Sequence, residues 1–302
     1  MKPVTSLCLY AILVSILFAV FPSHPSYADA AKITTPINDF SVVEIFKKGK
    51  EFYLAQNYID AEPLFQQCVK LEPKNAEYLS WLAQTIAFLL ADQAMKGASN
   101  LTLLPEARKV RELYQKAIDA DPKNERARLG YAIILRDIPG ILGGSIKKAE
   151  SILKGVIKDN PENIFALHHL GTLYIRKKND CQKGLECLKK VIAISQKKVL
   201  SPEEKLRLGA TYHALGKTYL EELNDASQAV PFLEKAAEMN EDSVLAFLDL
   251  AEAYRIEKQI AKAKDCLLKA VKISAAHEYK RFDDDIKSSA KKLNMKKELG
   301  LS

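Results

Sequence analysis

The stretch AEAYRIEKQIAKAKDCLLKAVKI, from Ala251 to Ile273, places small and large residues at helical spacing. Ala251 and Ala263 are small, whereas Tyr254 and Leu267 are large. A small residue on a first helix lets a second helix approach closely, and the aromatic residue three positions later fills the gap beside it. The stretch therefore predicts a hairpin of two packed helices.

The same arrangement returns several times along the chain. Residues 43–75 align with the stretch, and further units end in DADPKN (Asp119–Asn124) and KDNPEN (Lys158–Asn163), where a proline stops a helix. One hairpin cannot bury its own apolar faces, but stacked neighbours can, so the pattern predicts an array of hairpins. The small residues expected at the helix contacts are Gly49, Ala61, Gly171, Gly184, Gly216, Ala229, Ala251 and Ala263.

This pattern resembles the tetratricopeptide repeat (TPR) family, whose period is 34 residues. The resemblance implies an all-α fold, a right-handed TPR superhelix (α-solenoid) of about six helical hairpins plus a C-terminal capping helix. The expected domains are a signal peptide at 1–30, a linker at 31–40, the repeat domain at 41–276 and a basic C-terminal capping helix at 277–302. The six units are expected at 41–75, 76–124, 125–163, 164–196, 201–242 and 243–276.

Composition agrees with an all-α protein. Ala, Leu, Lys and Glu dominate, apolar residues make up 48%, and glycine is scarce, which favours packed helices over disorder. The formal net charge is 45 − 38 = +7, a mild excess over 302 residues. Such an excess indicates solubility more than a nucleic-acid footprint, so nucleic acid is not an expected partner.

The first thirty residues have the pattern of a secretory signal. Lys2 precedes an apolar stretch from Leu7 to Phe21, and Ala28 and Ala30 form the small-x-small site at which cleavage is expected after Ala30. The alternative is an uncleaved anchor in the inner membrane, but fifteen apolar residues are short of the roughly 20 that a span needs. We therefore expect an exported protein, periplasmic or secreted, with no stable membrane insertion after cleavage.

Three places depart from the simple repeat. The first helix of the second unit is expected to be long, ending near residues 97–100 before a restart around Pro105, and the first helix of the fifth unit is expected to be long from Ser201 onward. Pro63 and Pro231 are expected near helix starts, where little hydrogen bonding is lost.

The third unit carries the insert IPGILGGS (138–145) between its helices. An exported TPR chain with such an insert is similar to TatT-like components associated with TRAP transporters. The lipobox found in the lipoprotein members of that group is missing from this sequence.

No catalytic, metal or cofactor motif is found in the sequence, so the chain is not expected to be an enzyme. Adjacent His168 and His169 diverge by about 100° on a helix and cannot chelate one metal together. Cys181 and Cys187 lie about 9 Å apart along one helix, too far for a disulfide, unless Cys181 lies in a turn.

The residues after 276 are expected to form a terminal helix. Ile286, Ala290 and Leu293 share a face that fits a cap over the last repeat. The alternative is a basic helix that lies on anionic lipid.

The family resemblance implies a concave groove lined by first helices at positions two, five, nine and twelve of each unit. The residues at these positions lean basic, which favours an acidic protein segment or free carboxylate as ligand. The expected function is a non-enzymatic, exported scaffold for protein–protein interaction or complex assembly in the bacterial cell envelope, with self-association as a further option. The alternatives are solvated faces without a ligand, or an accessory component of a solute transporter that holds a small anionic ligand between the long helices of the second and fifth units. The groove residues are Lys50, Tyr53, Gln84, Arg126, Arg136, His168, His213, Lys217, Glu252 and Arg255.

Overall fold

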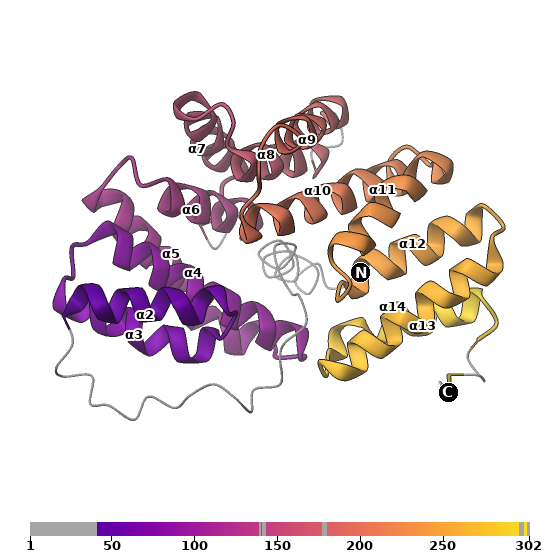
Figure 1. Cartoon of the computed structure of the whole chain (residues 1–302), viewed down its shortest axis with the longest axis horizontal. Coiled ribbons are helices and arrows are strands. Elements are labelled where there is room, and N and C mark those ends of the chain that lie inside the picture. The colour runs from indigo at the N-terminus through magenta and orange to yellow at the C-terminus, as the bar shows by residue number, and fades with distance from the viewer. Residues whose placement is uncertain (1–40, 139, 141–142, 177–179, 296–298, 301–302) are drawn as a thin grey trace. The chain divides into compact units, whose positions relative to one another are not determined.

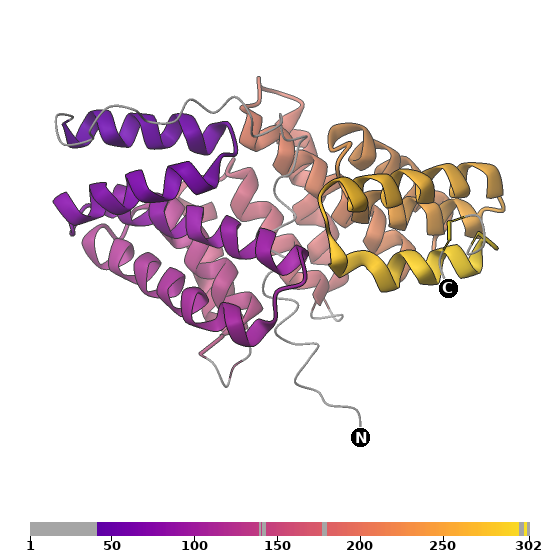
Figure 2. The same ribbon diagram turned by 90° about the horizontal axis from the view of Figure 1, so that it is seen from below.

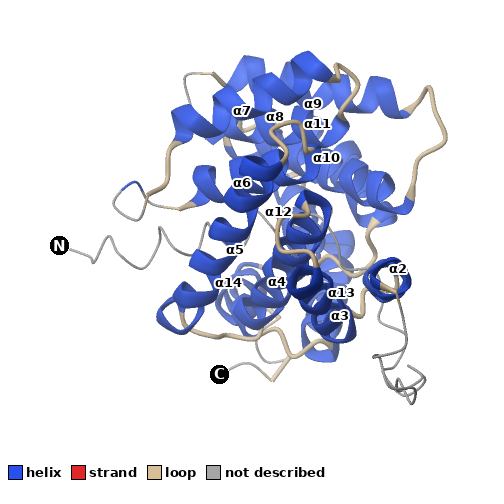
Figure 3. Cartoon of the chain, turned by 90° about the vertical axis from the view of Figure 1, so that its left-hand side faces the viewer, coloured by secondary structure: helices blue, strands red, loops and turns tan. Residues whose placement is uncertain are grey.

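The computed structural model describes residues 41–138, 140, 143–176, 180–295 and 299–300. Within these residues the chain forms thirteen α-helices and one short 3-10 helix, and no strand (Figures 1 and 3). The all-α prediction is confirmed for this part of the chain. The predicted signal peptide, with its cleavage residues Ala28 and Ala30, and the predicted linker lie outside the described residues.

The described chain divides into two compact units. Unit 1 comprises residues 41–94 and 98–159, and unit 2 comprises residues 95–97 and those from 160 onward. Among the described residues, no helix has both the length and the apolar character that crossing a membrane requires.

Unit 1 contains three successive helical hairpins. Ser41 begins the first with a capping box: its hydroxyl accepts from the backbone N–H of Glu44, while the Glu44 carboxylate accepts from the Ser41 backbone. Asn124 caps the third hairpin by accepting from the Ala127 N–H. The helices are α2 (Val42–Leu54), α3 (Tyr58–Leu71), α4 (Ala76–Met95), α5 (Asn100–Ala120), α6 (Glu125–Asp137) and α7 (Ile146–Asp159).

Unit 2 contains three further hairpins and a terminal helix (Figures 1 and 2). The sequence correctly predicted two long first helices, α4 in unit 1 and α10 in unit 2, and Ser201 caps α10 through a capping box with Glu204. The helices are α8 (Ile164–Arg176), α9 (Cys181–Ser195), α10 (Pro202–Glu221), α11 (Ala226–Met239), α12 (Val244–Ile256), α13 (Ile260–Ala276), the 3-10 helix η4 (Lys280–Phe282) and α14 (Asp283–Lys292).

Three prolines lie deeper in their helices than the sequence suggested. Pro63, Pro105 and Pro231 each follow the first residue of their helix by five positions, so each removes a hydrogen bond from the second turn. The expected restart of a helix around Pro105 is also wrong, because α5 already begins at Asn100, where the Ser99 hydroxyl accepts from the Thr102 N–H.

Small residues stand at the crossings of paired helices. A Cβ atom built at Gly49 would lie 2.8 Å from the Phe65 ring, and one at Gly216 would lie 2.5 Å from Cγ of Leu233. In the α8–α9 hairpin, Gly171 and Gly184 meet backbone to backbone. Their lack of side chains lets the two helices approach this closely. The alanines at the corresponding contacts, Ala61, Ala229, Ala251 and Ala263, are all buried.

The first and last elements are adapted to the ends of the array. On α12, which packs against the preceding helix α11, Ala246, Leu250 and Ala253 are buried. The residues in the same register on α2 are Glu44, Lys48 and Glu51, which are exposed or half-buried. At the other end, α14 packs against α12 and α13 and buries Ile286, Ala290 and Leu293. This face of α2 thus carries charged side chains, whereas α14 covers the last hairpin.

Candidate binding surfaces

In unit 1 two cations lie on one tryptophan. The Arg126 guanidinium carbon is 3.8 Å from the centre of the Trp81 ring, and Lys50 Nζ is 5.7 Å from the same ring. Arg126 also donates from Nη1 to Oε1 of Gln84. These residues come from α2, α4 and α6, the first helices of three successive hairpins. We call Lys50, Trp81, Gln84 and Arg126 the Trp81 surface.

The Trp81 ring is a fixed platform for these cations because other aromatic rings hold it. The centre of the Trp81 ring lies 4.9 Å from the ring centre of Tyr53, 5.7 Å from that of Phe65 and 6.0 Å from that of Phe46. Lys50 and Arg126 are half-buried, and neither has a carboxylate partner in the part of the chain that the structure describes. Cations on an aromatic face, partly removed from water and without a counter-ion, favour an incoming carboxylate.

In unit 1, two residues that the repeat register assigned to the groove are buried instead. Tyr53 is 4% exposed and packs its ring against those of Tyr58 and Trp81, so it belongs to the aromatic core of unit 1. Arg136 is 5% exposed, and its Nε and Nη2 atoms lie 2.8 and 2.9 Å from the two carboxylate oxygens of Asp137. Helical periodicity gave their position on the helix, but the neighbouring side chains cover that position.

In unit 2 the predicted groove residues form hydrogen bonds between successive first helices. His168 Nδ1 lies 2.9 Å from the Thr211 hydroxyl, which donates its own proton to the Arg207 carbonyl. His168 must therefore donate through Nδ1. His213 Nε2 lies 2.8 Å from Oδ2 of Asp249. Both histidines are buried, so they join α8 to α10 and α10 to α12 rather than facing a ligand.

The charged groove residues of unit 2 are also paired. Lys217 Nζ lies 2.8 Å from Glu221 and 3.5 Å from Asp249. Arg255 forms a bidentate pair with Glu252 at 2.8 and 3.0 Å, and Lys292 of α14 reaches the same carboxylate at 2.9 Å. The hydrogen bond from Arg255 comes first among the causes that hold the pKa of Glu252 below its usual value, although partial burial opposes it. Lys217 and Arg255, the predicted groove bases of unit 2, are thus already paired with carboxylates.

The sequence did not single out Trp81 or Asp249, yet each organises the polar residues of its unit. Both lie two positions before a buried small residue of their helix, Ala83 and Ala251 respectively. That shared register is the signal that could have identified them.

Among the described residues, the cysteines form no disulfide and the histidines join no metal-binding group. Cys181 and Cys187 both lie on α9, and all four cysteines of the described chain are free. The rings of His168 and His169 are tilted at 84° to each other, and the described residues contain no group of three or more side chains that could hold a metal ion.

The Asp249 carboxylate should make the stability of the protein depend on pH. Burial opposes its ionisation, but the hydrogen bond from His213 and the charge of Lys217 outweigh burial, so the pKa of Asp249 lies below its ordinary value. A lowered folded-state pKa stabilises the fold above about pH 4, and this contribution is lost as the pH falls. We expect Asp249→Asn to cost about 1–3 kcal/mol near neutral pH and less at about pH 3.

Urea unfolding followed by far-UV circular dichroism at both pH values measures this difference. Asp265→Asn, at an exposed position of α13, is the matched control and should change little at either pH. An Asp249→Asn penalty of equal size at both pH values would show that packing, and not the charge, supplies the stabilisation.

Comparison with known proteins identifies the repeat. Family models described as tetratricopeptide repeat match residues 159–242 and 245–277. Three solved structures are similar in fold. Pseudomonas aeruginosa PilF is 14% identical, covering 81% of this chain and 97% of that one, with a TM-score of 0.51. A thermophilic TPR protein of Thermus thermophilus is 20% identical, and the match covers 70% of this chain and 98% of that one, with a TM-score of 0.52. Human IFIT1, a dimer with m7Gppp-AAAA, is 20% identical, covering 84% of this chain and 57% of that one, with a TM-score of 0.61.

Proposed function

This chain is a tetratricopeptide repeat protein, and from that premise we propose that it is an exported, non-enzymatic scaffold that binds an acidic protein segment at the Trp81 surface. TPR proteins are generally scaffolds for protein–protein interaction. The observation that carries the proposal is the pair of cations, Lys50 and Arg126, held over Trp81 without a carboxylate partner in the described chain. An acidic segment would supply the missing counter-charges as charge-assisted hydrogen bonds.

The place of binding is narrower than the sequence predicted. The groove positions in unit 2 are occupied by ion pairs within the chain, such as Arg255–Glu252 and Lys217–Asp249. A ligand carboxylate there would have to displace an existing one. Of the predicted groove positions, the proposal therefore assigns the acidic segment to those of the Trp81 surface, where no such exchange is needed.

The proposal also includes export to the cell envelope. It is supported by the apolar stretch from Leu7 to Phe21 and by the small residues Ala28 and Ala30 at the end of the first thirty residues. The similarity to TatT-like components stays a prediction. The small-ligand pocket expected between the long first helices of the second and fifth repeats also stays a prediction, because α4 and α10 belong to different units. The m7Gppp-AAAA of the IFIT1 structure is not carried over to this chain at 20% identity.

The binding test is a charge reversal on the Trp81 surface. We expect the double variant Lys50→Glu, Arg126→Glu to bind a fluorescent hexaglutamate peptide at least about tenfold more weakly than the wild type at low salt, because two attractive contacts become repulsive. Fluorescence anisotropy measures the affinity. The emission of Trp81, the one tryptophan of the chain, should also change when the peptide binds to the wild type.

Lys47→Glu, Lys123→Glu is the matched control, because it makes the same change in net charge at exposed positions of unit 1. An equal loss in both double variants would mean that net charge alone attracts the peptide. Unchanged binding by the Lys50→Glu, Arg126→Glu protein would remove the Trp81 surface as the site. The same two proteins, used as baits on a cell-envelope extract, then report whether a natural partner depends on these cations.

A further inference from the structure

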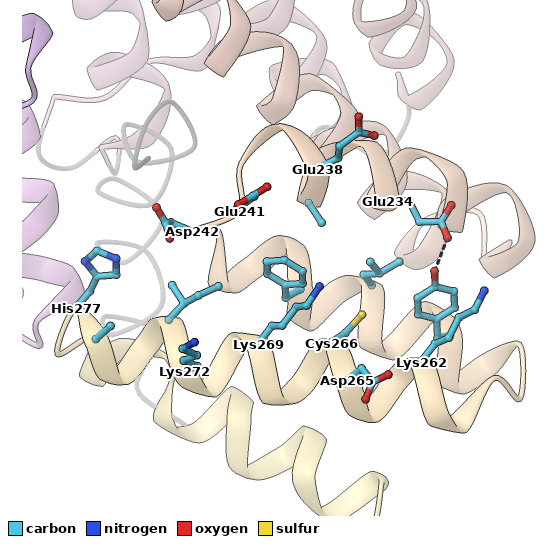
Figure 4. Close-up of a pocket in the computed structure, with 16 residues that line it drawn as sticks. Glu234, Glu238, Glu241, Asp242, Lys262, Asp265, Cys266, Lys269, Lys272 and His277 are labelled. Carbon is cyan, nitrogen blue, oxygen red and sulfur yellow. Dashed lines mark hydrogen bonds between the residues drawn. The ribbon is translucent and has the colours of Figure 1, made fainter. Parts of the chain in front are cut away.

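A groove of about 670 Å³ lies in unit 2 between α11 and α13, with α12 as its floor (Figure 4). Phe247, Leu250 and Tyr254 of α12 form the floor. One wall carries four carboxylates: Glu234 and Glu238 on α11, and Glu241 and Asp242 in the loop that follows. The other wall, on α13, carries the three lysines Lys262, Lys269 and Lys272 together with Asp265. We call this the α11–α13 groove.

The opposite charges of the two walls do not pair with each other in the described part of the chain. Among the described residues, no ion pair joins a carboxylate of the first wall to a lysine of the second, and Glu238 pairs instead with Lys235 on its own helix. The Tyr254 hydroxyl donates to the Glu234 carboxylate, which holds that carboxylate beside the floor of the groove. The groove thus keeps an acidic edge and a basic edge apart, with an apolar floor between them.

Lysines and aromatic rings recur together along the groove. Lys262 Nζ lies 5.0 Å from the centre of the Tyr254 ring, and Lys269 Nζ lies 5.3 Å from that of Phe247. Both the two lysines and the two rings are seven residues apart on a helix, which corresponds to about 10.5 Å along the axis. The groove therefore offers two similar stations, each consisting of a lysine beside an aromatic ring, about two helical turns apart.

This spacing distinguishes a helical ligand from an extended one. A helix laid along the groove presents residues i and i+7 on the same side, about 10.5 Å apart, so like charges at that interval meet both stations. An extended chain covers the distance in about three residues, and an odd step puts the side chain on the opposite face. An extended segment therefore cannot offer the same charge to the same wall at both stations.

We propose that the α11–α13 groove docks an amphipathic helix of a protein partner, with acidic residues seven apart along one flank and basic residues along the other. The acidic flank pairs with Lys262 and Lys269, the basic flank pairs with the carboxylates beside α11, and small apolar residues of the seam lie on Leu250. This is helix-in-groove recognition, with charge complementarity setting the register. The site lies in unit 2 and is independent of the Trp81 surface.

The probe is a synthetic three-heptad helix with an alanine and leucine seam, glutamate along one flank and lysine along the other. A control peptide has the same composition and seam, but glutamate and lysine alternate along each flank. Both peptides carry no net charge, so attraction to the positive protein as a whole does not distinguish them. We expect the wild type to bind the first peptide about tenfold more tightly than the second, because two pairs of flank charges become repulsive in the second.

Charge reversal on the protein completes the test. Lys262→Glu, Lys269→Glu should lose about tenfold in affinity for the first peptide and should gain affinity for a third peptide with lysine on both flanks. Lys287→Glu, Lys291→Glu, at exposed positions of α14, is the matched control and should bind like the wild type. Circular dichroism confirms that each variant is folded. Equal affinity of the wild type for the first two peptides, or equal losses in the two double variants, would overturn the proposal.

Discussion

Replacing Gly184 by alanine should lower the free energy of unfolding by about 2–3 kcal/mol, even though alanine usually stabilises a helix interior by about 1 kcal/mol over glycine. The reason is the crossing of α8 and α9. A Cβ atom at Gly184 would lie 2.8 Å from the carbonyl oxygen of Gly171 and 2.5 Å from Cγ1 of Ile175. The carbonyl oxygen belongs to the backbone of a hydrogen-bonded helix and cannot rotate away, so the two helices must move apart.

Gly209→Ala in α10 is the matched control. Outside its own helix, a Cβ atom there would have Cβ of Met239 as its nearest neighbour, at 3.2 Å, and would meet no backbone carbonyl oxygen of another helix within 4 Å. Its stability should stay within about 1 kcal/mol of the wild type, because the gain in helix propensity offsets a small adjustment of the packing. Urea unfolding followed by far-UV circular dichroism compares the two variants. If Gly184→Ala proved as stable as Gly209→Ala, the close approach of α8 and α9 would not be required for the fold.

The hairpins could be predicted because the residues that decide them act locally. The spacing of Gly171 and Gly184 reports the approach of two helices that are neighbours in sequence, and the capping box of Ser201 and Glu204 lies within one helical turn. A repeated local pattern also predicts stacking, since each hairpin has the same apolar faces to cover. Helix starts near proline were predicted less well, because α5 tolerates Pro105 in its second turn.

The roles of the groove residues could not be predicted in the same way. His213 bonds to Asp249, 36 positions away, and Lys292 bonds to Glu252 across 40 positions. Such pairs depend on how one hairpin lies on the next, which the repeat register does not specify. The register did bring Lys50, Gln84 and Arg126 together, because all three lie on first helices of successive hairpins. It did not indicate that Trp81 would hold the two cations.

Phe65→Ala should have the largest effect on stability in unit 1, about 3–5 kcal/mol. The side chain is fully buried, with its ring centre 5.7 Å from those of both Phe46 and Trp81. Truncation removes the apolar contacts of the ring and leaves a cavity beside Gly49, which has no side chain to fill it. Phe65→Leu should cost less, because other hairpins place a fully buried leucine, such as Leu233, in the same register.

Trp81 makes this test specific to unit 1. It is the one tryptophan of the chain, so its fluorescence during urea unfolding reports on the core that contains Phe65. Ile59→Ala, on the same helix but 62% exposed, is the control and should stay within about 0.5 kcal/mol of the wild type. The midpoint of the fluorescence transition should fall furthest for Phe65→Ala and less for Phe65→Leu. A midpoint for Phe65→Ala close to that of Ile59→Ala would show that the aromatic cluster is not what fixes Trp81 beneath Lys50 and Arg126, and the binding platform would then need another origin.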